Sequence, residues 1–229
     1  MSTDRAAPRR SIRLAGLALT AMASFAIAIP RAIGAESPSP AKIIVAFGDS
    51  LTAGLGVALD DTYPARLERR LRDHRYPYRV INAGVSGDTT AGGLRRVEWV
   101  LQTHPDIVIV ELGANDGLRG LSTTLIRENL AQIIARFQAA GATVILAGMR
   151  VPPNYGASYS SAFADLFPDL ATRYHVPIIP FFLDGVAGVG ALNQADGIHP
   201  TAEGYRVIVD RLWPVILPVL DAERPARSP

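Results

Sequence analysis

The stretch KIIVAFGDSLTAG, residues 42–54, decides the fold. Its apolar first half is continuous rather than alternating, which is typical of a strand that is covered on both faces. The run then ends abruptly in glycine, aspartate and serine, as a chain does when it leaves a buried strand and turns sharply. A phosphate-cradling loop or an ordinary tight turn can have the same pattern. Ser50 is therefore either a nucleophile or a helix cap.

The same alternation of strand-like and helix-like segments continues along the chain. Further apolar runs predict strands, and longer amphipathic segments predict the helices that connect them. The predicted strands are 42–47, 78–83, 106–112, 143–149 and 176–182, and the predicted helices are 63–73, 90–102, 125–140, 159–174 and 202–220. Five such repeats predict an open, doubly wound α/β sheet of five parallel strands, with helices on both faces in three layers.

Length and composition are those of a single globular domain. The 229 residues are 48% hydrophobic and 19% charged and include 20 glycines and 17 prolines, which suits one core with many turns. We therefore expect one domain over residues 36–229, with a frayed tail over 223–229. The sequence contains no cysteine, which excludes disulfides and a thiol nucleophile.

The first 35 residues have the layout of a secretory signal peptide. Four arginines precede the apolar run 14–29, and the small residues Gly34 and Ala35 follow it. We expect cleavage after Ala35, with Gly34 and Ala32 as alternative positions, and export to the periplasm or the medium. A retained membrane anchor is the alternative. The pair Arg9 and Arg10 also fits a twin-arginine signal, so the export route stays open.

The expected cleavage changes the charge of the chain. Residues 1–35 contain five arginines and one aspartate, so their removal leaves 18 basic and 20 acidic residues and takes the formal charge from +2 to −2. The basic pI therefore belongs to the expected signal, and no charge excess favours nucleic acid as a partner. We expect no stable membrane anchor after processing, and a monomer.

The loops at the carboxyl ends of the strands are the candidate site, because ligands of open α/β sheets bind there. His199 lies in the loop after the fifth strand, with Asp196 three residues upstream. This spacing lets the carboxylate bond one ring nitrogen and leaves the other for the Ser50 hydroxyl, which needs a base. A plain helix start is the alternative for both residues. The remaining histidines are expected to be solvated or capping residues: His74, His104 and His175.

Two further loops offer hydrogen-bond donors for an oxyanion. Gly87 can present a backbone N–H with no side chain in the way, and Asn115 carries a neutral amide donor. Each of them alone is a common turn residue. Four loops at one edge that together supply a nucleophile, two donors and an acid–base pair favour acyl transfer instead. Asp49, Asp88 and Asp116 are expected to have structural roles in these loops.

The stretches FGDSLTAG, NAGVSGDT, LGANDG and DGIHP resemble the four sequence blocks of the GDSL or SGNH hydrolase family, and the resemblance spans residues 43–218. It is greatest for the bacterial periplasmic members with thioesterase, lysophospholipase and arylesterase activity. It implies a flavodoxin-like sheet order of 2-1-3-4-5 and no metal or organic cofactor. It also implies the following roles: Ser50 as nucleophile, His199 as general base and then acid, Asp196 as the residue orienting His199, and an oxyanion hole of the Ser50 N–H, the Gly87 N–H and the Asn115 side chain.

The walls that select the substrate are expected in the third and fourth loops. An apolar groove for an acyl chain could be made there by Leu118, Leu121, Pro152, Pro153, Tyr155 and Tyr159. The alternative is that the prolines only stiffen the loop and the tyrosines pack against the core. Arg119 and Arg150 are expected to be surface charges, although either could meet an anionic headgroup.

These features predict an exported serine hydrolase that cleaves acyl esters and thioesters, lysophospholipids included, through a covalent acyl-enzyme. A carbohydrate O-acetyl esterase of the same family is the second hypothesis, and the apolar third and fourth loops weigh against it. A flavodoxin-like phosphate or flavin binder is the third. The chain lacks G-x-x-x-x-G-K and G-x-G-x-x-G, and this hypothesis leaves Asp196 and His199 unexplained.

Overall fold

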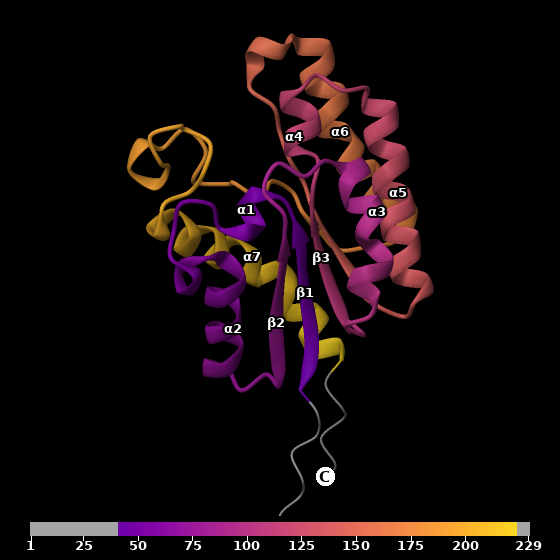
Figure 1. The fold of residues 1–229 in the computed structure, drawn as a ribbon, viewed down its shortest axis with the longest axis vertical. Helices are drawn as coiled ribbons and strands as arrows, with labels where there is room; N and C mark the ends of the chain where they lie inside the picture. The colour runs from indigo at the N-terminus through magenta and orange to yellow at the C-terminus, as the bar shows by residue number, and fades with distance from the viewer. Residues whose placement is uncertain (1–40, 224–229) are drawn as a thin grey trace, which may run out of the picture. The chain divides into compact units, whose positions relative to one another are not determined.

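The computed structural model of the chain describes residues 41–223, in which five parallel strands form one sheet (Figure 1). Their order across the sheet is β2-β1-β3-β4-β5. The strands are β1 (Lys42–Gly48), β2 (Tyr78–Gly84), β3 (Ile107–Glu111), β4 (Thr143–Ala147) and β5 (Ile178–Ile179). The predicted doubly wound, five-stranded parallel sheet and its order of 2-1-3-4-5 are confirmed.

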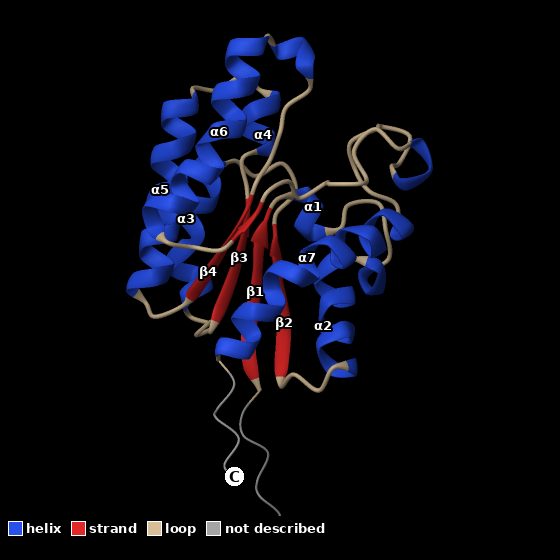
Figure 2. Ribbon diagram, turned by 180° about the vertical axis from the view of Figure 1, so that it is seen from behind, coloured by secondary structure: helices blue, strands red, loops and turns tan. Residues whose placement is uncertain are grey.

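Helices connect the strands and cover both faces of the sheet. The helices are α1 (Ser50–Ala53), α2 (Tyr63–Asp73), α3 (Thr90–Leu101), α4 (Ala114–Leu118), α5 (Thr123–Ala139), α6 (Ala157–Tyr174) and α7 (Ala202–Ala222). Helix α2 packs beside α7, while α3, α5 and α6 pack beside one another. Figures 1 and 2 show these two groups on opposite faces, which gives the three predicted layers.

The core explains why the strands are continuous apolar runs. Ile44, Val45, Ala46 and Phe47 of β1 all have no solvent exposure, because the sheet is covered on both sides. Helix α2 begins as its sequence predicts. The Thr62 side chain accepts a hydrogen bond from the backbone N–H of Ala65, and a proline stands in the first turn.

The last strand is shorter than predicted. The apolar run 176–182 predicts a strand of seven residues, but only Ile178 and Ile179 pair with β4. Pro177 and Pro180 flank the pair and have no N–H to donate to a neighbouring strand, which limits the ladder. Helices α1 and α4 are not predicted at all, since four or five residues are too few to show helical periodicity.

The two ends of the described chain meet at the amino end of the sheet. The Glu223 carboxylate accepts hydrogen bonds from Lys42 Nζ at 2.8 Å, Tyr78 Oη at 3.0 Å and Thr143 Oγ1 at 3.0 Å. The expectation of a tail frayed from 223 onward is therefore wrong for Glu223 itself. The rest of that tail and the expected signal peptide, 1–35, lie outside the described residues.

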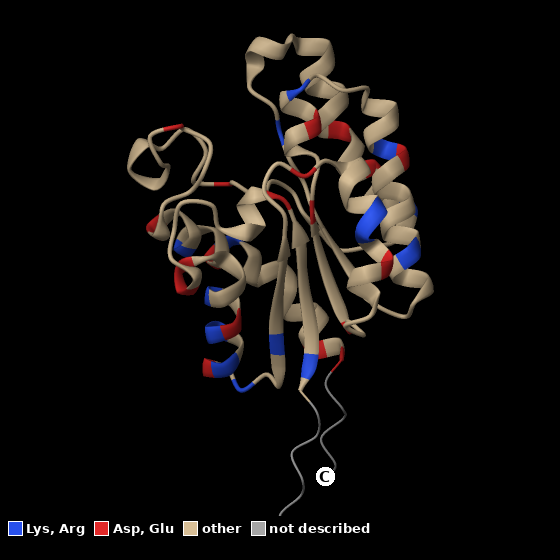
Figure 3. Ribbon diagram, viewed as in Figure 1, with Lys and Arg blue, Asp and Glu red and all other residues tan. Residues whose placement is uncertain are grey.

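All the described residues belong to one compact unit. No helix between residues 41 and 223 is long and apolar enough to cross a bilayer. Figure 3 shows acidic positions where β1 and β3 end, whereas many basic positions lie along α2. The carboxyl edge of the sheet, where the candidate site is expected, is therefore rich in carboxyl groups.

Candidate active site

The loops after β1, β2, β3 and β5 surround a cavity of about 280 Å³ at the carboxyl edge of the sheet. It is lined by Asp49, Ser50, Leu51, Leu55, Ser86, Gly87, Ala114, Asn115, Leu118, Ile198 and His199. Four of the residues predicted to share a site, Ser50, Gly87, Asn115 and His199, thus face the same space. They come from four separate loops, as the topology of the sheet requires.

The turn after β1 answers whether Ser50 is a helix cap. The N-cap of α1 is Asp49, whose Oδ1 accepts from the Leu51 N–H at 3.0 Å, and Ser50 is the first residue of the helix. The turn is completed by Gly54, whose φ of +80° favours glycine. The capping function therefore belongs to Asp49, and the Ser50 hydroxyl is left for another partner.

That partner is His199. Ser50 Oγ lies 2.9 Å from His199 Nε2, and His199 Nδ1 lies 2.6 Å from Asp196 Oδ2. A carboxylate can only accept, so Nδ1 carries the proton and Nε2 is free to accept from the serine hydroxyl. The three side chains form a continuous chain of hydrogen bonds from an exposed carboxylate to a serine that is only 8% exposed.

Asp196 is held in place by the backbone of its own loop. Its Oδ1 accepts from the N–H groups of Ile198 at 2.9 Å and His199 at 3.0 Å. The His199 backbone N–H, the His199 ring and the Ile198 N–H together lower the pKa of Asp196 to about 2. The carboxylate is therefore ionised throughout the neutral range, as a partner of an imidazolium must be.

Two of the predicted donors have distinct structural reasons for their residue type. Gly87 has a φ of +78°, and a Cβ built on it would meet nothing within 4 Å. Backbone conformation, and not lack of space, therefore favours glycine there. Asn115 Nδ2 donates to Asp49 Oδ2 at 3.0 Å. Because an amide nitrogen carries two hydrogens, one remains to point into the cavity.

A second buried carboxyl group, Glu111, lies beneath the turn and was missed in the sequence. Its Oε2 accepts from Thr52 Oγ1 at 2.7 Å and from the Asp49 backbone nitrogen at 3.4 Å, while Oε1 has no hydrogen-bond partner among residues 41–223. Burial raises the pKa of Glu111 well above its usual range, and burial also raises the pKa of Asp49 to about 6. The signal that could have found Glu111 is a charged residue that closes an apolar strand.

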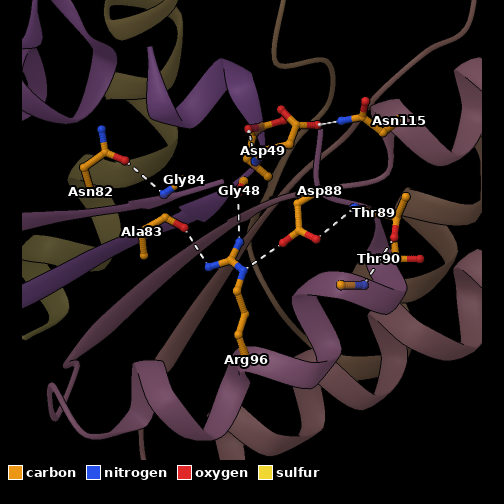
Figure 4. A network of polar contacts seen from close by, with 12 residues as sticks. Gly48, Asp49, Asn82, Ala83, Gly84, Asp88, Thr89, Thr90, Arg96 and Asn115 are labelled. Carbon is orange, nitrogen blue, oxygen red and sulfur yellow. Dashed lines mark hydrogen bonds and ion pairs between the residues drawn. The ribbon is translucent and has the colours of Figure 1, made fainter. Parts of the chain in front are cut away.

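The remaining loop aspartates bind neighbouring groups, as expected of structural residues. Asp88 pairs with Arg96, a residue of α3 that sequence reasoning also missed (Figure 4). Asp116 accepts from the Thr90 N–H at 2.9 Å and from Thr90 Oγ1 at 2.6 Å. These contacts join the loop after β3 to the start of α3, and hence to the loop that carries Gly87.

A larger, mainly apolar groove of about 420 Å³ adjoins the cavity at Ser50, and Leu51, Ala114, Leu118 and Ile198 line both. Pro152 and Pro153 line this groove, as predicted. Its other lining residues include several that were not singled out in the sequence: Met149, Val151, Phe181, Leu183, Ala187 and Gly188. The groove is therefore built by the loops after β3, β4 and β5 together.

The other three predicted groove residues are placed elsewhere. Leu121, Tyr155 and Tyr159 line neither the cavity nor the groove. The Tyr155 hydroxyl donates to the carbonyl oxygen of Leu118 at 2.7 Å, and the Tyr159 hydroxyl donates to that of Leu121 at 2.8 Å. Tyr155 therefore joins the segment before α6 to the end of α4, and Tyr159 joins α6 to the segment after α4. Of the two, Tyr159 also packs against the core, as the alternative expects.

The charged candidates and the other histidines lie outside the cavity at Ser50. Arg150 lines the groove with its guanidinium 5.0 Å from the Phe181 ring centre, and exposed Arg119 donates to the Gly87 carbonyl oxygen at 3.1 Å. His74, His104 and His175 line neither cavity. Within the part of the chain that the structure describes, no three acidic or histidine side chains are grouped to hold a metal ion.

Comparison with known proteins identifies the family. The GDSL-like Lipase/Acylhydrolase family model matches residues 46–207. Esterase TesA of Pseudomonas aeruginosa is 42% identical to this chain, and the match covers 79% of this chain and 90% of TesA. Thioesterase 1/protease 1/lysophospholipase L1 of Escherichia coli K12 is 37% identical, and the match covers 79% of this chain and 86% of that protein. The solved structure of AlinE4, an SGNH-hydrolase family esterase, is 45% identical with a TM-score of 0.67 and covers 82% of this chain and 100% of its own. The resemblance seen in the four blocks is thus confirmed, and the chain belongs to the GDSL-like lipase/acylhydrolase family.

Proposed function

We propose that this chain hydrolyses carboxylic esters and thioesters with Ser50 as the nucleophile. The observation that carries the proposal is the hydrogen-bonded series from Ser50 Oγ to His199 Nε2, at 2.9 Å, and from His199 Nδ1 to Asp196, at 2.6 Å. A free serine hydroxyl is a weak nucleophile, and a base within hydrogen-bond distance activates it. Membership of the family of GDSL-like lipases and acylhydrolases supports the same reaction class.

In the first half of the reaction, Ser50 Oγ attacks the substrate carbonyl carbon while His199 Nε2 takes the hydroxyl proton. Asp196 stabilises the imidazolium that forms. The bond from the acyl carbon to the alcohol oxygen or thiol sulfur then breaks, and His199 returns the proton to the leaving group. In the second half, a water molecule gives its proton to His199 and attacks the acyl-enzyme, which releases the acid and restores Ser50.

The charge that develops on the carbonyl oxygen is stabilised by three donors from residues that line the cavity. They are the backbone N–H groups of Ser50 and Gly87 and the free hydrogen of Asn115 Nδ2. Loss of a single donor of this kind lowers kcat by about a hundredfold to a thousandfold. The Asn115 donor stays in its neutral form at any working pH, so it serves throughout the pH range of the enzyme.

The apolar groove supports substrates with an acyl chain longer than acetyl. Its volume of about 420 Å³ and its lining by Met149, Phe181 and Leu183 suit a hydrocarbon chain. A carbohydrate O-acetyl esterase, the competing hypothesis, needs a small pocket with polar sugar contacts. Relatives named arylesterase and lysophospholipase support the wider range of acyl esters and thioesters.

We further propose that residues 1–35 are a cleaved export signal and that the mature enzyme works as a monomer in the periplasm or outside the cell. The arginine-rich start, the apolar run 14–29 and the small residues Gly34 and Ala35 support this. Determining the N-terminal residue of the exported protein tests the cleavage site. Light scattering of the purified mature protein tests the monomer.

The test of the function is hydrolysis of p-nitrophenyl esters of increasing acyl length by the mature protein, with Ser50→Ala measured beside it. We expect a broad or longer-chain optimum in the wild type and no turnover in the variant. Wild-type rates in Ser50→Ala would contradict the proposal, and a sharp preference for acetyl would favour the O-acetyl esterase. Inactivity of both proteins would favour the phosphate or flavin binder.

A further inference from the structure

The loop between β2 and α3 carries a proposed oxyanion donor within a tight turn. Gly87 lies in the middle of this loop with a φ of +78°, and no heavy atom stands within 4 Å of where its Cβ would be. The Asp88 N–H donates to the Val85 carbonyl oxygen at 3.0 Å and closes the turn around Gly87, and the exposed Arg119 side chain donates to the Gly87 carbonyl oxygen at 3.1 Å. This turn fixes its own shape, so the position of the Gly87 N–H relative to Ser50 depends on what holds the two ends of the loop.

Both ends of the loop are held by one guanidinium group (Figure 4). Arg96 Nη1 donates to the Ala83 carbonyl oxygen at 2.7 Å, where the loop begins, and Arg96 Nε donates to Asp88 Oδ2 at 2.8 Å, where it ends. The third contact runs from Arg96 Nη2 to the Gly48 carbonyl oxygen at 2.8 Å. Gly48 closes β1 and is separated from Ser50 by Asp49 alone.

The Gly48 carbonyl is thus the point where the two loops join. It accepts from Arg96 and also from the Val85 N–H, at 3.0 Å, which belongs to the same loop as Gly87. The Arg96 side chain is only 16% exposed, and its guanidinium stands 4.0 Å from the ring centre of Phe47. Hydrogen bonds to a charged group that is shielded from water are stronger and less easily exchanged than surface contacts.

Helix α3 leaves room for the contact between Asp88 and Arg96 because residue 92 is a glycine. Asp88 Oδ1 accepts from the Thr89 N–H at 3.1 Å, and a Cβ added at Gly92 would lie 1.7 Å from the same oxygen. A side chain at Gly92 would therefore displace the Asp88 carboxylate from Arg96. The glycine, the aspartate and the arginine form one unit that links α3 to the ends of β1 and β2.

We propose that Arg96 is a positioning residue of the oxyanion hole. Its guanidinium holds the Gly87 N–H at a fixed position relative to the turn that carries Ser50. This inference rests on the proposed function, because it assumes that both residues donate to the oxyanion. The guanidinium is suited to the task because it presents several N–H donors in one rigid plane. A lysine keeps the charge but cannot reach two carbonyl oxygens and a carboxylate in the same geometry.

The test compares Arg96→Lys with Arg95→Lys, a matched control one residue away. Arg95 is exposed and has no hydrogen bond or ion pair within the described part of the chain. Turnover of p-nitrophenyl butyrate and the rate of Ser50 modification by a p-nitrophenyl alkylphosphonate are measured well below the melting temperature of every variant. We expect kcat and the modification rate to fall about tenfold to a hundredfold in Arg96→Lys, with KM within about twofold. Arg95→Lys should match the wild type.

A merely structural role for Arg96 would give a different result. Arg96→Lys would then melt earlier but keep the wild-type kcat at low temperature, and this outcome would overturn the inference. If Arg96→Lys does not fold, Asp88→Asn replaces it, since the amide loses the charge that pairs with Arg96 and keeps one acceptor oxygen for the two donors, Arg96 Nε and the Thr89 N–H. An unchanged kcat in folded Asp88→Asn would likewise overturn the inference. Ser50→Ala separates the two proposals: wild-type rates in that variant refute the proposed function itself.

Discussion

Carboxyl groups stand on two sides of Ser50, and their surroundings are opposite. Asp196, beside His199, is 45% exposed, accepts three hydrogen bonds, and has its pKa lowered to about 2. Asp49 and Glu111, on the core side of the turn, have no solvent exposure, and burial raises the pKa of both. Hydrogen-bond donors favour the charged form of Asp196. Desolvation favours the neutral form of Asp49 and Glu111, and the nearby Asp49 carboxyl group adds to this effect at Glu111.

This difference separates two tasks that the same functional group can perform. An ionised Asp196 stabilises positive charge on His199, so its charge is useful there. Charge next to an oxyanion hole is harmful, because the hole must stabilise a negative oxygen. Burial and the nearby Asp49 raise the pKa of Glu111 well above its usual range and favour its neutral form, while Asp49 accepts from Asn115 and Leu51. Burial thus limits the negative charge beneath the nucleophile.

The largest effect is expected from Asp196→Asn. The amide oxygen can still accept from the loop N–H groups, but the amide cannot stabilise the imidazolium and can leave the ring in the wrong tautomer. We expect kcat for a short-chain p-nitrophenyl ester to fall by about a thousandfold to ten-thousandfold. Asp60→Asn, an exposed carboxylate in the loop after β1, is the control and should be unchanged. A loss below about tenfold would contradict the role of Asp196.

A smaller effect is expected from Asp49→Asn on the other side of Ser50. The new amide can still cap α1 with its oxygen, but its NH₂ would face Asn115 Nδ2, so two donors would meet. Rotation of the Asn115 amide would relieve this contact and direct its oxygen into the cavity, which removes one oxyanion donor. We expect kcat to fall about a hundredfold with little change in KM.

The measurement for Asp49→Asn is a double-mutant cycle with Asn115→Ala. Because both changes remove the same donor, the double variant should be no slower than Asn115→Ala alone. Independent, multiplying losses in the cycle would mean that Asp49 acts on some other group. His199 would then be the first alternative, since its charge also lowers the pKa of Asp49.

The exposed pair of Asp196 and His199 could be predicted from the sequence, whereas the buried contact between Glu111 and the Ser50 turn could not. Asp196 and His199 lie within one turn of chain, so their spacing alone brings the carboxylate to the ring. Their loop follows a strand, and the topology of parallel sheets places it beside Ser50. Glu111 is separated from Thr52 by 59 positions, and only the pairing of β1 with β3 brings them together.

The same reasoning explains which parts of the fold were predictable. Continuous apolar runs identify β1, β3 and β4 because both of their faces are buried. The limits of β5 depend on two prolines that interrupt pairing, which an apolar run does not reveal. Tyr155 and Tyr159 illustrate the remaining limit, since hydroxyl bonds to distant carbonyl oxygens leave no pattern in the sequence.

Glu111→Gln should change the pH dependence of stability. The folded protein keeps the Glu111 proton above the usual pKa of 4.5, where the unfolded chain releases it. Folding stability therefore falls as pH rises above about 4.5, and the buried Asp49, with its pKa of about 6, adds to the fall above its usual 3.8. The neutral amide removes the contribution of Glu111, so we expect the free energy of unfolding to fall less between about pH 5 and pH 8 in the variant than in the wild type.

Urea unfolding of the two proteins at both pH values measures this difference. Asp49, His199 and the hydroxyls of Tyr63 and Tyr205 are the other titratable groups around the turn, and they remain in the variant. Asp106→Asn, a carboxylate at the amino end of the sheet that binds the Ile43 N–H, is the control. Parallel pH profiles for wild type and Glu111→Gln would show that Glu111 is ionised in the folded protein.

The smallest effect is expected from Tyr205→Phe, which removes one contact beneath the Ser50 turn. The Tyr205 hydroxyl donates to the Leu51 carbonyl oxygen at 2.9 Å, and the ring is fully buried. Loss of this hydrogen bond should lower the free energy of unfolding by about 1 kcal/mol. Tyr78→Phe is the matched control, since the Tyr78 hydroxyl binds Glu223 at the amino end of the sheet. If the turn is held chiefly by its carboxyl groups, both variants lose similar stability and both keep kcat within about threefold. A kcat loss confined to Tyr205→Phe would mean that the hydroxyls beneath Ser50 position the nucleophile as well, and the contrast between the two regions would then extend beyond their carboxyl groups.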